Sequence, residues 1–205
     1  MKQTEKDFLK LAIDLEALRF GDFTLKSGMK SSYFFNISAF FNSETFHKLI
    51  SFYYQEIIDS GLDYQVLFGP AYKGIPLASG LSSLIGETEG KSAPFAFDRK
   101  EVKDHGEGGS LVGDVKDKKV LIIDDVLTAG TALKNSIDII NGIGGQVIGA
   151  IVALDREEVF NQVSAKDSLE KEMSIPILSI AKISNLIGFL KQNEEFSKYI
   201  KYFNQ

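Results

Sequence analysis

Two adjacent carboxylates, Asp124 and Asp125, open the segment whose residue types point most directly to chemistry. They follow the apolar, β-branched run Val120–Ile123, which predicts a strand buried on both faces. They precede a short turn, Val126–Ala129, after which Gly130 allows close backbone approach and Thr131 offers a hydroxyl. The next residues, Ala132–Ile140, predict a helix, whose first N–H groups lack intrahelical partners and attract anions. Paired carboxylates suit sugar hydroxyls or a hydrated divalent cation. The segment therefore predicts a sugar-phosphate site, although an Asp at a strand end often serves only as a helix cap.

A second segment repeats this arrangement around a lysine. Gln65–Phe68 predicts a short buried strand, Ile75–Ile85 predicts a helix, and the loop between them, Gly69–Gly74, contains Lys73. In open α/β sheets, ligands bind where the carboxyl ends of strands lead into helix N-termini. Lys73 is therefore a candidate phosphate ligand, and a surface lysine in a turn is the simpler alternative.

A third segment, residues 99–114, combines cations with glycines after a predicted strand at Pro94–Phe97. Glycines give a segment high backbone entropy. Charges on such a loop can be merely solvated, or they can belong to a lid that closes over a polyphosphate. The cationic side chains and glycines are Arg99, Lys100, Lys103, His105, Gly106, Gly108, Gly109 and Gly113.

The elements that must hold these loops alternate between strand and helix from residue 43 to residue 182. A helix is predicted at Ser43–Ser60, and two further strands are predicted at Gln146–Ala153 and Ile175–Ser179. Such alternation predicts an α/β fold with a mainly parallel central sheet flanked by helices. Arg156 then lies at a strand's carboxyl end.

The first 40 residues break the alternation. Apolar residues at helical spacing predict a helix over residues 3–19, and short strands are expected at Phe23–Leu25 and Tyr33–Asn36. This region is interpreted as a cap over the carboxyl edge of the sheet. Helices near Ser184–Leu190 and Glu194–Phe203 end the chain.

Composition bounds the class of protein. The 205 residues allow one domain, or one core with a small appendage, and their 44% hydrophobic and 25% charged content is that of an ordinary globular protein. The net charge of −5 and pI of about 5.2 disfavour nucleic acid and membrane surfaces as partners. The chain has no cysteine, its first residues are polar, and no run of 18 apolar residues occurs, so a cytoplasmic protein is expected.

Six separated strings occur in order along the chain. They are FTLKSG (23–28), YFFN (33–36), FGPAYKGIPLA (68–78), RKEVKDHGEGG (99–109), VLIIDDVLTAGTA (120–132) and LDRE (154–157). Together they resemble the orotate phosphoribosyltransferase family. The motif at 120–132 is similar to the 5-phosphoribosyl 1-diphosphate (PRPP) signature of the type I phosphoribosyltransferases, and neither a Walker loop nor a G-x-G-x-x-G fingerprint is present. The other strings narrow the resemblance to the orotate enzymes over nearly the full length.

The resemblance implies a type I phosphoribosyltransferase fold, with a central, mainly parallel sheet flanked by helices and a small N-terminal hood. It implies one domain over 1–205, in which residues 1–42 with a contribution from 183–205 form the hood and residues 43–182 form the α/β core. The implied reaction joins the phosphoribosyl group of PRPP to N1 of orotate, giving orotidine 5′-monophosphate and diphosphate in pyrimidine biosynthesis.

The resemblance also implies roles for individual residues. The loop at 126–131 would wrap the 5′-phosphate, and Asp124 and Asp125 would hold the ribose hydroxyls, with Mg²⁺ bridging to the diphosphate. Arg156 fits the orotate carboxylate, because its planar fork can bind a carboxylate bidentately. The residues implied to bind PRPP are Lys26, Tyr72, Lys73, Arg99, Lys100, Lys103, His105, Asp124, Asp125, Val126, Leu127, Thr128, Ala129, Gly130, Thr131 and Ala132. Those implied to contact orotate are Phe34, Phe35, Thr128 and Arg156.

Lys103, Asp124 and Asp125 are the implied catalytic residues, with Lys103 expected to be the most rate-critical side chain. The family pattern places the lid residues Arg99, Lys103 and His105 in the neighbouring subunit's site, which implies a homodimer. It also implies a cis peptide bond at Ala71–Tyr72. Departures from the pattern are small. They are Met29 where a basic residue is common, Ser32 where proline is common and Asp98 where an amide is frequent.

Two alternatives remain from the sequence. Another type I phosphoribosyltransferase, acting on a purine or uracil, would share the motif at 120–132 and should lack the YFFN string and the lid. A non-catalytic regulator that keeps the PRPP loop as a sensor would need a nucleic-acid-binding element, and no basic helix-turn-helix pattern is visible.

Overall fold

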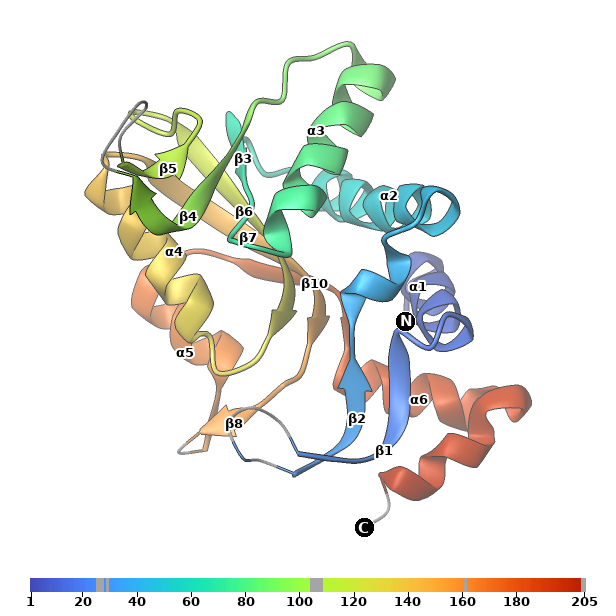
Figure 1. Ribbon diagram of the computed structural model, residues 1–205. Helices are drawn as coiled ribbons and strands as arrows, with labels where there is room; N and C mark the ends of the chain where they lie inside the picture. The colour runs from blue at the N-terminus through green and yellow to red at the C-terminus, as the bar shows by residue number, and fades with distance from the viewer. Residues whose placement is uncertain (25–27, 29, 104–108, 161, 204–205) are drawn as a thin grey trace. The chain divides into compact units, whose positions relative to one another are not determined.

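The chain folds into two compact units, each described here by itself. The computed structural model describes residues 1–24, 28, 30–103, 109–160 and 162–203 (Figure 1). The first unit combines Met1–Leu49 with Ala181–Gln205, and the second is Ile50–Ile180. That these units are the hood and core of a single functional domain stays a prediction.

The second unit is built on a six-stranded sheet of order β10–β7–β6–β3–β4–β5. Neighbouring strands from β4 through β3 and β6 to β7 are parallel, and β5 runs antiparallel to β4. The predicted α/β fold with a mainly parallel sheet is therefore confirmed. The strands are β3 (Val66–Phe68), β4 (Phe95–Lys103), β5 (Gly109–Val112), β6 (Lys119–Leu127), β7 (Gln146–Asp155) and β10 (Ile177–Lys182).

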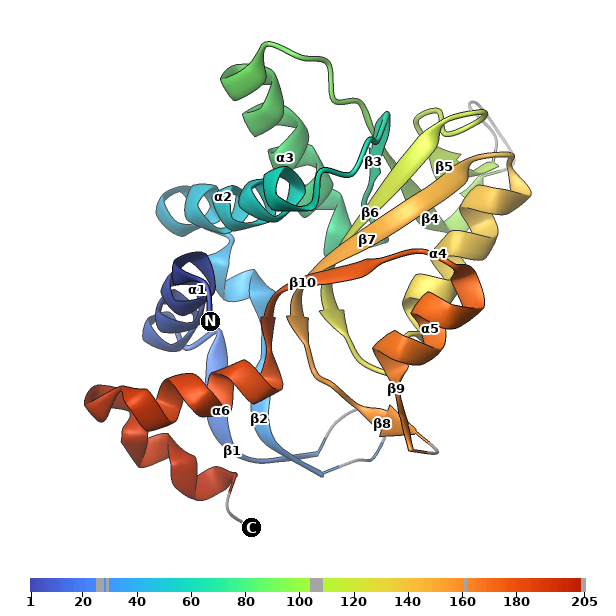
Figure 2. The same cartoon turned by 180° about the vertical axis from the view of Figure 1, so that it is seen from behind.

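Helices cover both faces of this sheet. Helices α4 (Thr131–Gly142) and α5 (Ala165–Met173) lie on one face, while α3 (Gly74–Glu89) and the second half of α2 (Ser43–Ser60) lie on the other (Figures 1 and 2). Right-handed crossovers between parallel strands place helices in this way.

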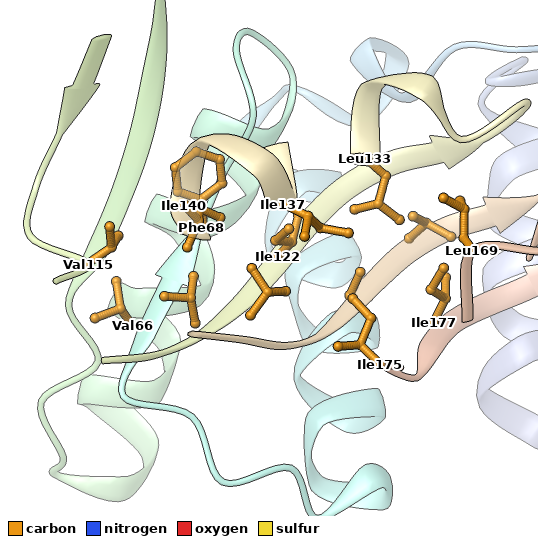
Figure 3. Close-up of a cluster of buried hydrophobic side chains, with 14 of the residues drawn as sticks. Val66, Phe68, Val115, Ile122, Leu133, Ile137, Ile140, Leu169, Ile175 and Ile177 are labelled. Atoms are coloured by element: carbon orange, nitrogen blue, oxygen red, sulfur yellow. The ribbon is translucent and has the colours of Figure 1, made fainter. Parts of the chain in front are cut away.

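Alternation of side chains along each strand divides the core between the two faces. In α4, Leu133, Ile137 and Ile140 form one stripe that packs against Ile122 of β6, as Figure 3 shows. Leu169 from α5 joins the same cluster. Each fully buried side chain of this kind contributes about 1.5–3 kcal/mol to stability. The cluster therefore fixes the helix whose N-terminus follows the Asp124–Asp125 pair.

Strand β6 is longer than its sequence predicts. The strand was expected to end at Ile123, but it continues through the acid pair to Leu127. Strand β7 stays paired with it to the end, where Leu127 lies opposite Asp155, whereas β3 stops with Phe68 opposite Ile122. Beyond Ile122, β6 thus keeps a neighbour on one edge only. The expected turn at Val126–Ala129 is correspondingly wrong at its start, because Val126 and Leu127 belong to the strand.

The lid region also differs from its prediction as a loop. Arg99, Lys100 and Lys103 lie in strand β4, which pairs with β5 up to Lys103 opposite Gly109, with an irregular register after Asp98. The glycine-rich composition gave no strand signal for β4 and β5. The two strands form because they pair with each other, and their local sequence propensity does not predict them. Helix α5 and the two-residue strands β8 (Val159–Phe160) and β9 (Val163–Ser164) were not anticipated either.

The first unit is held by aromatic rings. Its elements are α1 (Gln3–Asp14), the antiparallel pair β1 (Leu18–Thr24) and β2 (Lys30–Phe35), η1 (Ile37–Phe40), α6 (Ile183–Gln192) and η2 (Glu194–Tyr202). Phe8 of α1 packs on Phe35 and Phe40, with ring centroids 6.2 and 6.0 Å away. Phe20 of β1 stacks on Tyr199 of η2 at 4.4 Å. These contacts join the N-terminal hairpin to the last turns of the chain.

Candidate active site

Three loops of the second unit leave the carboxyl ends of adjacent parallel strands. The segment after β3 leads into α3, the segment after β6 leads into α4, and β7 ends at Asp155 beside Leu127 of β6. Parallel strands bring their carboxyl ends to one edge, which is where open α/β sheets bind ligands. The structure thus brings together the segments of Lys73, of the acid pair and of Arg156.

One hydrogen bond joins the two aspartates to each other, and two more hold them to neighbouring residues. The N–H of Asp125 donates to Oδ1 of Asp124 at 2.8 Å, and Nζ of Lys73 donates to Oδ2 of Asp125 at 2.8 Å. Beneath the pair, the buried hydroxyl of Tyr53 in α2 donates to the Asp124 carbonyl at 2.7 Å. Lys73 is 43% exposed and Asp125 is 16% exposed, so the cation lies on the open side of the pair.

The two carboxylates are not equivalent electrostatically. Burial, and then the negative charge of Asp125, raise the pKa of Asp124 from 3.8 to about 7, and the Asp125 N–H and Lys73 offset only part of this. Burial likewise raises the pKa of the Tyr53 phenol well above 10, with Asp125 and Asp124 adding to the effect. A buried carboxyl whose pKa is raised this far by burial and a neighbouring charge is typical of a functional position.

The loop after β6 is shaped for an anion. Helix α4 begins at Thr131, and its N-cap residue, Gly130, has a φ of +82° and no side chain that could cap the first turn. A Cβ at Gly130 would lie 2.2 Å from Cδ1 of Leu169 in α5, so glycine serves both the left-handed conformation and the close packing. Thr128, Ala129, Thr131 and Ala132 are exposed. The N–H groups at this end of the helix are therefore available to an anionic ligand.

The loop after β3 is held by close backbone packing. A Cβ at Gly74 would meet the carbonyl oxygen of Ile123 at 2.8 Å, so the loop lies directly against β6 where β3 has ended. The Ala71–Tyr72 peptide bond is cis, which confirms the expectation for this position. The N–H of Ala71 donates to Oδ1 of Asp98 in β4 at 2.5 Å.

The chain is similar in sequence and fold to known phosphoribosyltransferases. Residues 36–178 match the phosphoribosyl transferase domain family. The chain is 49% identical to the orotate phosphoribosyltransferase of Marinobacter nauticus over 96% of this chain and 93% of that protein. It is also 49% identical to that of Kluyveromyces lactis, over 93% of this chain and 88% of that protein. The chain belongs to the orotate phosphoribosyltransferase family. A crystal structure of the Francisella tularensis orotate phosphoribosyltransferase matches with a TM-score of 0.82 at 37% identity, covering 97% of this chain and 98% of that one.

The other expected site residues have the following positions in the structure. Arg156 directly follows β7, and its N–H donates to the Leu127 carbonyl at 3.1 Å. Tyr72 is 65% exposed, and Arg99 is partly buried in β4. The backbones of Lys100 and Lys103 belong to β4, whereas Lys26 and His105 lie outside the described residues.

The two aromatic residues implied to border orotate differ in their surroundings within the first unit. Phe35 is 6% exposed and packs into the core on Phe8, whereas Phe34 is only partly buried. Phe34 lies beside Phe23, 5.7 Å between centroids, with the Arg19 guanidinium 5.4 Å above its ring. This opposite orientation follows from the alternation of side chains along β2.

One cavity of about 840 Å³ borders the loop after β6. Its lining includes Gly130 and Thr131 of the loop, Phe160 of β8 and Ser168 of α5, and it includes neither carboxylate of the acid pair. The cavity therefore lies on the α5 side of the loop rather than at the centre of the candidate site.

Within the described ranges, no group of three or more acidic or histidine side chains could hold a metal ion. No helix in the described part of the chain is both long and apolar enough to cross a membrane.

Sequence reasoning assigned no role to Tyr53 or Asp98, whose side chains hydrogen-bond to the backbones of Asp124 and Ala71. Tyr53 lies on the buried stripe of α2 between Ile50 and Ile57, a pattern that signals a buried hydroxyl in need of a partner. The identity of that partner, 71 residues away, is not readable from the pattern.

Proposed function

We propose that this protein transfers the 5-phosphoribosyl group from PRPP to N1 of orotate, giving orotidine 5′-monophosphate and diphosphate in de novo pyrimidine biosynthesis. The observation that carries the proposal is the convergence of Lys73, the acid pair and the Arg156 segment at one sheet edge. It occurs in a chain whose curated relatives, 40–49% identical, are named orotate phosphoribosyltransferase.

The chemistry follows from where charge develops. The bond from ribose C1 to the diphosphate largely breaks before orotate N1 bonds to C1, so the ribose ring becomes positive and the leaving diphosphate becomes more negative. Such a reaction needs cations around the leaving group and exclusion of water from the sugar cation. In the proposal, the cations are Lys26, Lys73, Arg99, Lys100 and Lys103, and no dedicated general base is needed because orotate is already anionic.

The remaining roles are those that the family resemblance implies. The N–H groups of Val126–Thr131 and of the α4 N-terminus would bind the 5′-phosphate, and Asp124 and Asp125 would accept hydrogen bonds from the ribose hydroxyls. Tyr72 and Lys73 would contact the diphosphate. Orotate would contact Phe34, Phe35 and Thr128, with its carboxylate on Arg156.

Mg²⁺ is proposed as the cofactor, held mainly by the phosphates of PRPP near Asp124 and Asp125. The residues present fit this arrangement, because two carboxylates are suitable oxygen ligands and the described residues offer no larger group that could hold the ion alone. When bound with PRPP, Mg²⁺ would neutralise part of the diphosphate charge. A homodimer in which Arg99, Lys103 and His105 complete the neighbouring site, and a cytoplasmic location, are further parts of the proposal.

The direct test is the orotate absorbance of a mixture of protein, orotate, PRPP and Mg²⁺, with each component omitted in turn. Loss of the orotate signal that requires both PRPP and Mg²⁺ is the expected result. If orotate persisted while PRPP bound, uracil, hypoxanthine and adenine would be tried in its place. Failure of all four bases would favour a non-catalytic PRPP sensor.

Replacing Asp98 with alanine is expected to raise the KM for PRPP by about tenfold or more, because the Ala71 N–H would lose a charged acceptor whose contribution is about 1.5–3 kcal/mol. The hydrogen bond holds the loop that carries Tyr72 and Lys73 in place. Steady-state kinetics with PRPP as the varied substrate would measure the change.

Asp98→Asn is the matched control, since an amide oxygen can accept the same hydrogen bond without adding negative charge near the diphosphate. We expect its KM for PRPP to stay at or below that of the unmodified protein. An alanine variant with an unchanged KM for PRPP, or an asparagine variant as impaired as alanine, would contradict the assignment.

A further inference from the structure

The Arg156 side chain is held by a neighbouring carboxylate. Its Nε donates to Oε1 of Glu158 at 2.7 Å, and the two side chains are only 9% and 13% exposed. Ion pairs shielded from water are weakened little by solvent, in contrast to pairs on the surface. The contact therefore restrains the plane of the guanidinium.

A tight turn brings these two side chains together. The Oδ1 of Asp155 accepts a hydrogen bond from the N–H of Glu157 at 2.8 Å, which is an Asx-turn, and Glu157 has a φ of +49°. A non-glycine residue in this left-handed region needs such local support. The turn thus redirects the chain between Arg156 and Glu158.

Both ends of the turn are anchored to the sheet and to α5. On one side, the Arg156 N–H donates to the carbonyl of Leu127, the last residue of β6. On the other side, the carbonyl of Glu158 accepts a hydrogen bond from the N–H of Ala165, the first residue of α5, at 2.9 Å. Glu158 is therefore a fixed point from which the arginine can be oriented.

The contact with Glu158 uses only one edge of the Arg156 guanidinium. Arginine presents five N–H donors in one rigid plane, and the Nε edge is distinct from the end that carries the two terminal nitrogens. With Glu158 on the Nε edge, rotation of the guanidinium plane is restrained and the end that carries the terminal nitrogens is directed away from Glu158. In the proposed function, this end would bind a planar carboxylate.

We propose that Glu158 is a positioning residue that orients Arg156 toward the carboxylate of the pyrimidine substrate, and so sets the preference for orotate over bases that lack a carboxylate. The inference rests on the proposed function. Glu158 acts through Arg156 and does not itself contact the substrate.

The negative charge of Glu158 is unfavourable for binding an anionic substrate, whereas its hydrogen bond to Arg156 is favourable because it orients the guanidinium. A second carboxylate near Arg156 repels an anionic substrate, so orientation, not charge, must be its contribution. Glutamine at 158 keeps an acceptor oxygen at the same reach and removes the repulsion. Alanine removes the acceptor, and aspartate keeps the charge but shortens the reach by one methylene.

The experiment compares the KM for orotate, the KM for PRPP and kcat in the unmodified protein and in Glu158→Gln, Glu158→Asp and Glu158→Ala. Uracil serves as the probe that lacks the carboxylate. Alanine and aspartate are expected to raise the KM for orotate about 10- to 100-fold, as expected for a misaligned charge-assisted pair, and to leave the KM for PRPP unchanged. The orotate-to-uracil preference should fall by the same factor. Glutamine should retain the orotate KM or improve it.

Glu172→Ala is the matched control, because it removes an ion-pair partner of Lys134 on the exposed surface of the same unit. All its constants should match those of the unmodified protein. If the unmodified protein did not convert orotate, both the proposed function and this inference would be overturned. Conversion of orotate by the unmodified protein, with an unchanged orotate KM in Glu158→Asp, would leave the function standing and overturn the role of Glu158. So would parallel losses for orotate and PRPP. If Glu158→Ala does not fold, the orotate KM of Glu158→Asp tests the role of Glu158.

Discussion

Replacing Lys103 with alanine is expected to lower kcat for orotate conversion by about 100- to 1000-fold, the usual effect of removing one preorganised group that stabilises transition-state charge. Negative charge on the diphosphate grows as its bond to ribose breaks, so a lid cation there acts mainly in the transition state. In the proposed function, orotate approaches the other side of the ribose carbon, so its KM should change by no more than about threefold. Steady-state and single-turnover kinetics would separate these effects.

Lys116→Ala is a suitable control, since this exposed lysine follows the same hairpin beyond β5. Its kinetics should be unchanged. Equal losses in kcat and in orotate affinity for Lys103→Ala would contradict the assignment of Lys103 to the leaving group.

The same variant tests the shared sites of the proposed homodimer. Subunits carrying Lys103→Ala can be co-expressed with subunits carrying Arg156→Ala, each inactive alone. If Lys103 serves the neighbouring site, every hybrid dimer contains one intact site, and random pairing should restore about a quarter of the full activity. No recovery in confirmed hybrid dimers would argue that Lys103 serves its own subunit.

Replacing Asp124 with asparagine is expected to lower kcat/KM for PRPP by about 100-fold or more while making the ligand-free protein more stable at pH 8. Burial and the charge of Asp125 raise the pKa of Asp124 to about 7, above its ordinary value of 3.8. A carboxyl whose pKa is higher in the folded state contributes stability below the unfolded value, and that stability is lost as pH rises through the folded value. Asp124 therefore destabilises the fold progressively between about pH 4 and pH 7.

Asparagine removes this ionisation, so the gain in stability at pH 8 should be on the order of a few kcal/mol and should disappear near pH 4. Thermal unfolding of both proteins across this range, without ligands, would measure the difference. Asp138→Asn, at an exposed position of α4, should change neither stability nor activity. A gain that was independent of pH would argue against ionisation of Asp124 as the cause.

The architecture of the core was readable from local patterns. Helix α2 was expected at Ser43–Ser60 and begins and ends there, because its apolar spacing and length leave little alternative. The strands at the centre of the sheet were found for the same reason, as continuous apolar runs buried on both faces.

Elements whose limits depend on neighbours were predicted poorly. Strand β6 passes through two aspartates because β7 continues beside it, and nothing in the aspartates themselves favours a strand. Helix α5 buries only Ala165 and Leu169, so its polar sequence carries little periodic signal.

The candidate site also contains residues that the local sequence identifies and residues that depend on distant partners. The acid pair and the loop after it were identified because they are contiguous in sequence. Tyr53 and Asp98 were assigned no role because their partners, Asp124 and Ala71, are 71 and 27 residues distant. Glu158 lies two residues from Arg156, but the turn that joins their side chains depends on the left-handed conformation of Glu157.

The hydrogen bond from Ala71 to Asp98 links two segments that are 27 residues apart in the sequence. Asp98 precedes Arg99 in the lid strand β4, while Ala71 belongs to the loop that leads into α3. Thermodynamic linkage is reciprocal, so a ligand that orders the loop must bias the conformation of β4 by the same coupling free energy with which β4 biases ligand binding. In the proposed function, Lys73 contacts the diphosphate of its own site while Arg99 serves the neighbouring one, so Asp98 would couple diphosphate binding in one site to the lid of the other.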